Sequence, residues 1–183
     1  ENLYWGDVAY TYAANFKYSV MGALGTLGVQ YRLADDWWAG IAVTTPTVAL
    51  SGSGRIQLSE VQGDDEGVGA AARYYDDLEA DNGRPAQIRA GLGWRRPEAG
   101  GVGIDVTHHL ARSFDWMDGN SGGEEVTIRQ KRVAVTDVQA GGEYIFRKRF
   151  PVRAGCFTSF SSAPDLDPEE TSTPSQVDLF GVT

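Results

Sequence analysis

The stretch LGVQYRLADDWWAGIA at residues 27–42 decides the fold class of this chain. Apolar residues occupy every second position on both sides of its central ADD, for example Leu27, Val29 and Tyr31 before it and Ala39 and Ile41 after it. A period of two is typical of a β-strand with one apolar face. Two such runs joined by a short Asp-containing turn predict an antiparallel hairpin.

The same alternation recurs along the rest of the chain and predicts an all-β, antiparallel fold. We expect about seven strands, at residues 18–33, 37–60, 86–95, 102–114, 133–146, 152–162 and from 176 to the last residue, 183. Short turns are predicted at about 33–36, 96–101 and 147–150, and long loops at about 61–83, 115–132 and 164–175. Short and long connections therefore alternate along the chain.

This alternation of connection lengths favours one all-β architecture over another. Outer-membrane barrels have short periplasmic turns and long extracellular loops, whereas a soluble sandwich has no reason to keep its long loops at one end. The sequence therefore predicts an antiparallel transmembrane β-barrel in the outer membrane of a Gram-negative bacterium. A soluble β-sandwich, whose charged face would simply be solvated, is the alternative.

The two faces of the predicted strands carry different side chains. In a barrel, charged residues opposite the apolar face line a wet lumen, and aromatic rings gather where the strands meet the membrane surface. The lumen-lining candidates are Arg32, Arg89, Arg95, Asp105, His109, Asp137, Glu143, Arg153, Phe157, Asp178 and Phe180. The predicted interfacial aromatic girdle consists of Tyr31, Trp37, Trp38, Trp94, Tyr144 and Phe146.

Composition limits the partners of the chain. The 183 residues have a mean hydropathy of −0.31, and no apolar run reaches the ~20 residues of a membrane-spanning helix. The net charge of −9 argues against a nucleic-acid partner, because phosphate contact needs a basic surface. Acidic residues gather at 64–66, 76–81 and 165–170 in the predicted loops. We expect a solvated loop surface there, with lipopolysaccharide-associated cations or a surface protein as alternative partners.

The sequence offers little for catalysis or for a cofactor. His108 and His109 are adjacent, so on a strand they point to opposite faces and cannot share one metal. A hydrolase needs a serine, a histidine and an acid within hydrogen-bond reach, and the sequence alone brings no such set together. The single Cys156 has no partner for a disulfide or a zinc site. We therefore expect no enzyme activity, no metal and no cofactor.

An odd number of strands cannot form a complete bacterial barrel. Bacterial single-chain barrels have an even strand count, and open strand edges in hydrocarbon would leave backbone groups unpaired. We therefore interpret residues 1–183 as a partial barrel domain that belongs to a longer polypeptide. Completion by strands of other chains is the alternative.

Several stretches also resemble a known family. They are residues 27–42, 44–54, 85–95, 103–107, 140–144, 151–157 and 162–165. In this order they are similar to the C-terminal half of outer-membrane long-chain fatty-acid transporters (FadL-type), a family that includes aromatic-hydrocarbon channels. The resemblance implies passive uptake of hydrophobic molecules through a barrel with an N-terminal hatch and a lateral wall opening. Neither feature is visible in this sequence.

Three functions remain open at this point. The first is a channel for passive uptake of hydrophobic small molecules, such as long-chain fatty acids or aromatic hydrocarbons, in contact with outer-membrane lipid and lipopolysaccharide. The second is a structural or interaction barrel that anchors a cell-surface complex. The third is a soluble β-sandwich binding domain. Dependence on detergent would separate the first two from the third.

Overall fold

The computed structural model describes residues 2–5, 8–64, 67–147, 149–164 and 177–183. These residues form β-strands joined by turns and irregular segments, and every strand pairing recorded among them is antiparallel. The predicted all-β, antiparallel class is therefore confirmed. The described ranges contain no helix long and apolar enough to cross a membrane. The chain divides into two compact units, which are described separately below.

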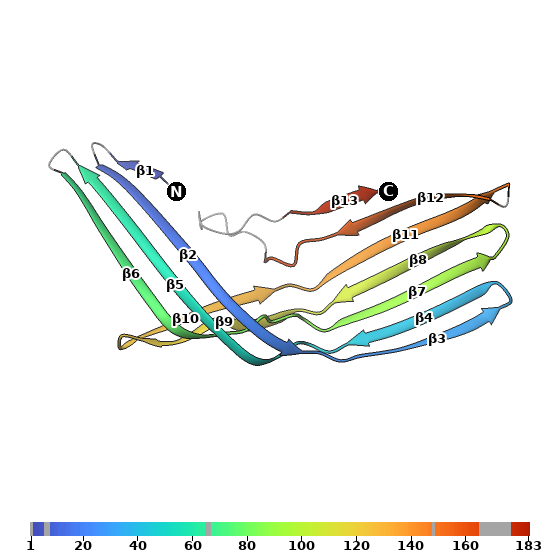
Figure 1. Cartoon of the computed structure of the whole chain (residues 1–183), viewed down its shortest axis with the longest axis horizontal. Helices are drawn as coiled ribbons and strands as arrows, with labels where there is room; N and C mark the ends of the chain where they lie inside the picture. The colour runs from blue at the N-terminus through green and yellow to red at the C-terminus, as the bar shows by residue number, and fades with distance from the viewer. Residues whose placement is uncertain (1, 6–7, 65–66, 148, 165–176) are drawn as a thin grey trace. The chain divides into compact units, whose positions relative to one another are not determined.

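Unit 2 comprises residues 24–48, 83–113 and 131–183 and contains a seven-stranded sheet (Figure 1). In chain order its strands are β3 (Thr26–Ala34), β4 (Trp37–Thr44), β7 (Gln87–Arg96), β8 (Gly100–His109), β11 (Val135–Phe146), β12 (Phe150–Ser159) and β13 (Leu179–Val182). Each overlaps one of the seven predicted strands. The bounds of three predictions are wrong, because the predicted strands 18–33, 37–60 and 102–114 are interrupted at 24–25, 45–47 and 110–111. The predicted count of about seven strands is also too low, since the described residues contain 13. Their spatial order, β13-β12-β11-β8-β7-β4-β3, keeps chain neighbours adjacent.

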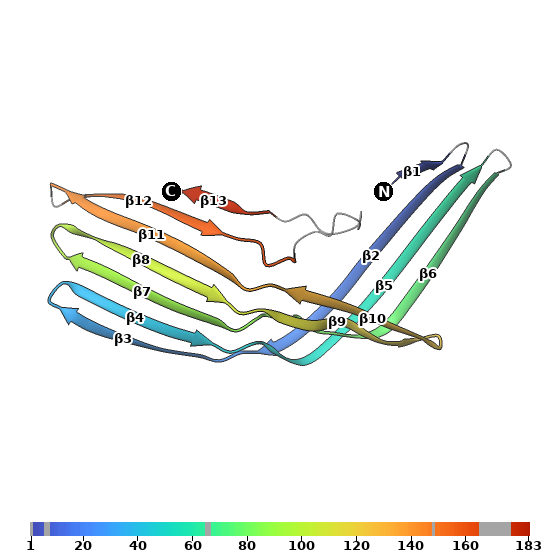
Figure 2. The ribbon, with the colours of Figure 1, turned by 180° about the vertical axis from the view of Figure 1, so that it is seen from behind.

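The three predicted short turns are confirmed, and they lie at one end of this sheet (Figures 1 and 2). They connect β3 to β4, β7 to β8 and β11 to β12. Gly100 opens β8 with a φ of 121°, and a Cβ there would lie 1.9 Å from the carbonyl oxygen of Glu143. Only glycine fits this position, because both the backbone angle and the close approach exclude a side chain.

Cross-strand register gives the sheet of unit 2 two distinct faces. Residues paired across antiparallel strands share a face, so each row of partners can be followed from strand to strand. One such row runs Val29, Ile41, Ala90, Val106, Val138. We call this side the apolar face; it carries Leu27, Val29, Tyr31, Trp37, Ile41, Val43, Ile88, Leu92, Trp94, Val102, Ile104, Val106, Val138, Tyr144, Val152, Cys156 and Val182.

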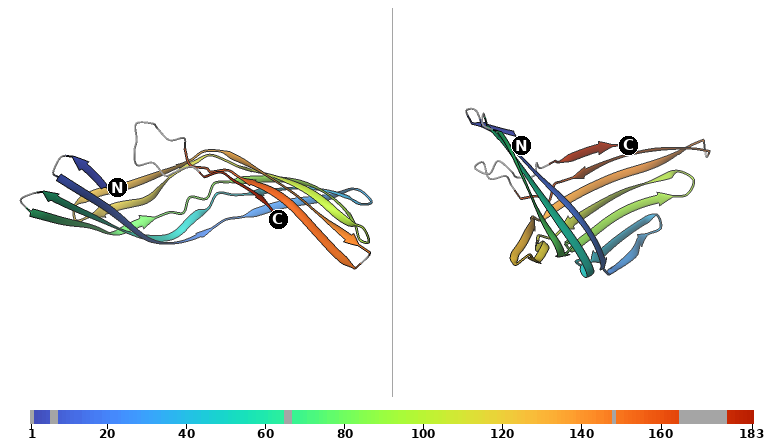
Figure 3. Two further views of the ribbon diagram at one scale, coloured as in Figure 1. Left: turned by 90° about the horizontal axis from the view of Figure 1, so that it is seen from above. Right: turned by 60° about the vertical axis from the view of Figure 1, so that its left-hand side comes forward.

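We call the opposite side of the sheet the charged face. One of its rows runs Gln30, Gly40, Gly91, Asp105, Gln139 and Phe157. The strands are twisted relative to one another, as sheets of this kind are (Figure 3). Among the described residues the edge strands β3 and β13 have no further partner, so this sheet is open.

Unit 1 comprises residues 1–23, 49–82 and 114–130 and contains a second, six-stranded sheet, which is open among the described residues. Its strands, in spatial order, are β1 (Asn2–Trp5), β2 (Val8–Ala23), β5 (Val48–Asp64), β6 (Gly67–Ala80), β9 (Arg112–Ser121) and β10 (Glu124–Arg132). Two predicted long loops are therefore wrong: β6 occupies most of 61–83, and β9 with β10 occupies most of 115–132. The third, 164–175, lies outside the described residues after Pro164.

Burial of apolar side chains explains why these supposed loops are strands. Ile56, Tyr75, Leu78 and Met117 form a core within unit 1, in which Leu78 and Met117 are 1% and 0% exposed. Trp116 packs beside them and contacts other aromatic rings of the same unit. These residues are spaced irregularly among Asp and Gly in the sequence, which hides the strand pattern.

A bidentate ion pair joins the hairpin of β9 and β10. Arg129 donates from Nε to Asp115 Oδ1 at 2.7 Å and from Nη2 to Oδ2 at 3.4 Å. The hydrogen bond from Arg129 holds the pKa of the Asp115 carboxyl below its usual value. The acidic cluster at 76–81 is also part of a strand rather than a loop, since it falls almost entirely within β6, where Asp76 pairs with Arg55.

Candidate functional site

The charged face of unit 2 collects most of the predicted lumen-lining residues. Register places nine of them on this side: Arg32, Arg89, Arg95, Asp105, His109, Asp137, Glu143, Arg153 and Phe157. They come from strands far apart in the sequence and share a face because the sheet is a regular antiparallel meander. The two-residue alternation predicts that they share one surface, and the register shows which of them lie beside one another.

Cross-strand contacts hold some of these charged side chains in place. Arg153 Nε lies 2.6 Å from Glu143 Oε2, its cross-strand partner. Arg89 Nε donates to Thr107 Oγ1 at 3.1 Å across β7 and β8. Such contacts across a sheet stabilise its register.

Two predicted lumen candidates do not lie where we expected them. Phe180 pairs with Thr158 on the apolar face, and its ring centroid is 5.8 Å from that of Phe160. Its assignment to the charged face is wrong, because the register of β12 with β13 places it opposite Thr158 rather than Phe157. Asp178 precedes β13, and its Oδ1 accepts a hydrogen bond from the Ser161 backbone at 2.9 Å.

The predicted aromatic girdle is divided between the two faces. Tyr31, Trp37, Trp94, Tyr144 and Phe146 lie on the apolar side of their strands, close to the short turns. Trp38 is the exception.

Register places Trp38 on the charged face, between Arg32 and Gly93. The Arg32 guanidinium carbon lies 5.7 Å from the centroid of the Trp38 ring, a cation–π arrangement. The position of Trp38 in the girdle is therefore wrong, because consecutive residues of a strand point to opposite sides.

Glycines shape the middle of the charged face. Gly93, Gly103, Gly141 and Gly155 are consecutive partners across β7, β8, β11 and β12. Without side chains they leave hollows of about 470 and 490 Å³, both lined in part by Asp105. The sequence shows these glycines, but only the register reveals that they form one row.

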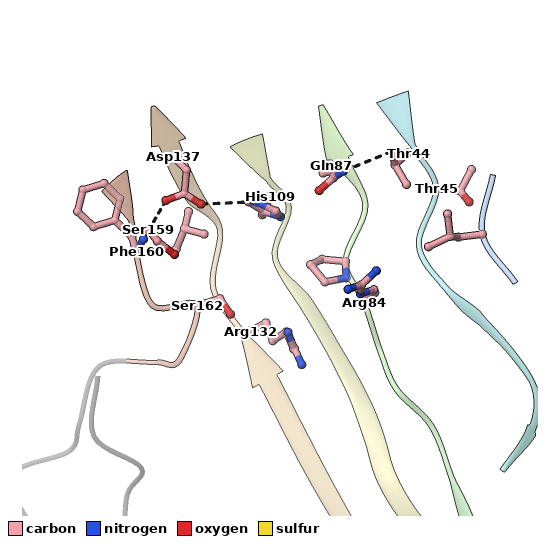
Figure 4. Close-up of a pocket in the computed structure, with 13 residues that line it drawn as sticks. Thr44, Thr45, Arg84, Gln87, His109, Arg132, Asp137, Ser159, Phe160 and Ser162 are labelled. Carbon is pink, nitrogen blue, oxygen red and sulfur yellow. Dashed lines mark hydrogen bonds and ion pairs between the residues drawn. The ribbon is translucent and has the colours of Figure 1, made fainter. Parts of the chain in front are cut away.

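A further pocket of about 480 Å³ lies at the strand ends of unit 2 opposite the short turns (Figure 4). We call it the strand-end pocket. Its lining residues are Leu24, Thr44, Thr45, Arg84, Pro85, Gln87, His109, Arg132, Val135, Asp137, Ser159, Phe160 and Ser162. All of them belong to unit 2.

Asp137 and His109 form one wall of the strand-end pocket. Asp137 Oδ2 lies 3.6 Å from His109 Nε2, and Asp137 Oδ1 accepts a hydrogen bond from the Phe160 backbone at 2.8 Å. His109 pairs in register with Val135, so Asp137 is its diagonal neighbour on the same face. Sequence reasoning missed this contact, because it depends on the register between β8 and β11.

The described residues contain no group of three or more His, Cys, Asp or Glu side chains that could hold a metal ion. No protein-family model, no curated protein and no solved structure matches the chain. The inference of function therefore rests on the sheet and on the residues of its two faces.

Proposed function

We propose that this chain is part of the wall of an outer-membrane β-barrel that passively takes up hydrophobic small molecules, such as long-chain fatty acids or aromatic hydrocarbons. The observation that carries the proposal is the two-faced sheet of unit 2. Its apolar face would contact lipid, and its charged face would line the channel. The proposed location is the outer membrane of a Gram-negative bacterium.

The exposure of the apolar face supports a lipid contact. Ile41, Val102 and Ile104, on strands inside the sheet, are 49%, 57% and 46% exposed on this side. Monomeric soluble proteins rarely expose contiguous apolar patches larger than a few hundred Å². In a sandwich, a second sheet would bury the apolar face at a distance of about 10 Å.

Strand length supports the same proposal. The six longer strands of this sheet contain 8 to 12 residues. A tilted strand needs about 9–11 residues to cross the hydrocarbon core. The short turns at one end of the sheet fit the periplasmic side of such a barrel.

Strand direction constrains how a wall of this kind could close. Seven alternating strands leave the edge strands β3 and β13 running in the same direction. An all-antiparallel closed wall then requires an odd number of further strands between them. Two copies of this sheet, related by rotation about a barrel axis, would bring β13 beside a parallel β3. We therefore expect strands of different sequence to complete the wall.

Unit 1 favours a second candidate function, a barrel that anchors a cell-surface complex. It has its own buried core and an acidic strand, β6, and could therefore bind a partner protein independently of transport. The two candidate functions make different predictions for cells that lack the protein: the channel predicts slower uptake of hydrophobic molecules, and the anchor predicts normal uptake.

Uptake in a deletion strain tests the proposed function. Cells lacking the protein should accumulate a radiolabelled long-chain fatty acid or aromatic hydrocarbon more slowly, whereas uptake of a small sugar should not change. Normal uptake across a panel of such compounds would contradict the channel and favour the anchoring role.

A substitution on the charged face should reproduce part of this defect. Phe157 offers an apolar ring on this face, positioned over Gly181. Phe157→Asp should slow uptake of the hydrophobic solute while the protein still reaches the membrane, because a solute loses that apolar contact. Gln30→Asp adds the same charge on the same face without removing a ring, and should have a smaller effect. Equal uptake by the two variants would show that the ring has no role.

A further inference from the structure

Two arginines distinguish the strand-end pocket from the rest of this acidic chain. The chain carries a net charge of −9, yet Arg84 and Arg132 both line this pocket together with His109. Figure 4 shows Arg84 and Arg132 below His109, in the space between the strand ends. Apolar side chains, including Leu24, Val135 and Phe160, form other parts of the lining.

The single carboxylate of the pocket is engaged elsewhere. Asp137 accepts the Phe160 backbone N–H through Oδ1 and faces His109 through Oδ2. It therefore fixes the wall of the pocket rather than pairing with Arg84. Among the described residues, no carboxylate pairs with the Arg84 guanidinium.

The backbone of Arg84 is held in place independently of its side chain. Its carbonyl oxygen accepts hydrogen bonds from the Thr47 backbone at 3.1 Å and from Arg112 Nη1 at 2.7 Å. Arg112 Nη1 also donates to the Thr47 carbonyl oxygen at 2.9 Å, which ties the two segments together. These hydrogen bonds fix the backbone of Arg84, and its guanidinium group remains available to a ligand.

We propose that the strand-end pocket binds a small organic molecule through an oxyanion group, a carboxylate or a phosphate. A guanidinium matches the planar or tetrahedral oxygens of such groups and binds them with charge-assisted hydrogen bonds. The volume of about 480 Å³ falls in the range of small-molecule sites, about 300–1,000 Å³, and exceeds what an inorganic ion fills. The remaining volume lies beside Leu24, Val135 and Phe160, which suit a compact apolar group.

Binding of phenyl phosphate and benzoate to the purified protein in detergent micelles, measured by calorimetry, tests this inference. Both probes should bind more tightly than neutral benzyl alcohol, and the stronger of the two identifies the preferred oxyanion. Inorganic phosphate should bind more weakly than phenyl phosphate, because it leaves the apolar part of the pocket unused. Equal binding of benzyl alcohol and the charged probes would overturn the proposal.

Arg84→Gln should weaken binding of the stronger probe at least about tenfold, because a charge-assisted hydrogen bond is lost. Arg132→Gln should also weaken binding of this probe. Arg149→Gln, in the turn between β11 and β12, removes the same charge outside the pocket and should leave affinity unchanged. Unchanged affinity in both pocket variants, with the strand content intact by circular dichroism, would overturn the assignment. This measurement is independent of the lipid contact, so its failure would leave the uptake proposal standing.

Discussion

Leu92→Arg is expected to destabilise the membrane-inserted protein by about 2–4 kcal/mol, the cost of an arginine on the lipid face near the bilayer midplane. Leu92 lies in the interior of β7 on the apolar face, where it pairs with Ala39 and Ile104. A guanidinium at this position would have to leave water for hydrocarbon. The free energy of unfolding in lipid vesicles, followed by tryptophan fluorescence during denaturant titration, measures the effect.

Gly93→Arg is the matched control for this substitution. Gly93 is the next residue of β7 and lies on the charged face. The nearest atom to a Cβ placed there is the Val102 carbonyl oxygen at 3.8 Å, so a side chain fits. We expect a clearly smaller loss of stability than for Leu92→Arg. A greater loss for Gly93→Arg would mean that the two faces are assigned the wrong way round.

Leu78→Ala should cost about 2–5 kcal/mol of local stability in unit 1, the range measured when a buried leucine is truncated to alanine. Leu78 is 1% exposed and packs in the core with Ile56, Tyr75 and Met117. The cavity left by the missing methyl groups loses both the transfer free energy and the packing contacts. Hydrogen exchange of amides in β5, β6 and β9 reports this loss as faster exchange.

Leu50→Ala provides the comparison within the same unit. Leu50 lies on β5 and is 63% exposed, so its truncation should change amide exchange little. If Leu78→Ala exchanged no faster than Leu50→Ala, the core of unit 1 would not be what holds β5, β6 and β9 together.

The sequence predicted the sheet of unit 2 well, because its strands alternate strictly. Residues 27–42 contain both strands of a hairpin and its turn, and the structure has β3 and β4 at this place. Apolar residues alternate within each of these predicted strands. The side chains that share a face of the strand can therefore be identified without knowing its neighbours in the sheet. The all-β antiparallel class and the short turns followed from this local signal.

Features that depend on register or on distant packing could not be predicted. The sequence places Phe180 on the wrong face, because it holds no local clue to the pairing of β13 with β12. The contact between His109 and Asp137 joins β8 to β11, and its geometry follows from a register that no local pattern fixes. The sequence predicts loops where β6, β9 and β10 of unit 1 lie, because burial of Leu78 and Met117, rather than alternation, stabilises these strands.

The contact of the apolar face with lipid is tested most directly by spin labels along β7. Single cysteines at Arg89, Ala90, Leu92 and Gly93, in a protein carrying Cys156→Ala, would bear nitroxides in lipid vesicles. Electron paramagnetic resonance then compares collision with lipid-soluble oxygen and with a water-soluble nickel complex. Ala90 and Leu92 should favour oxygen, and Arg89 and Gly93 should favour nickel. Preference for nickel at all four positions would contradict the lipid-facing sheet.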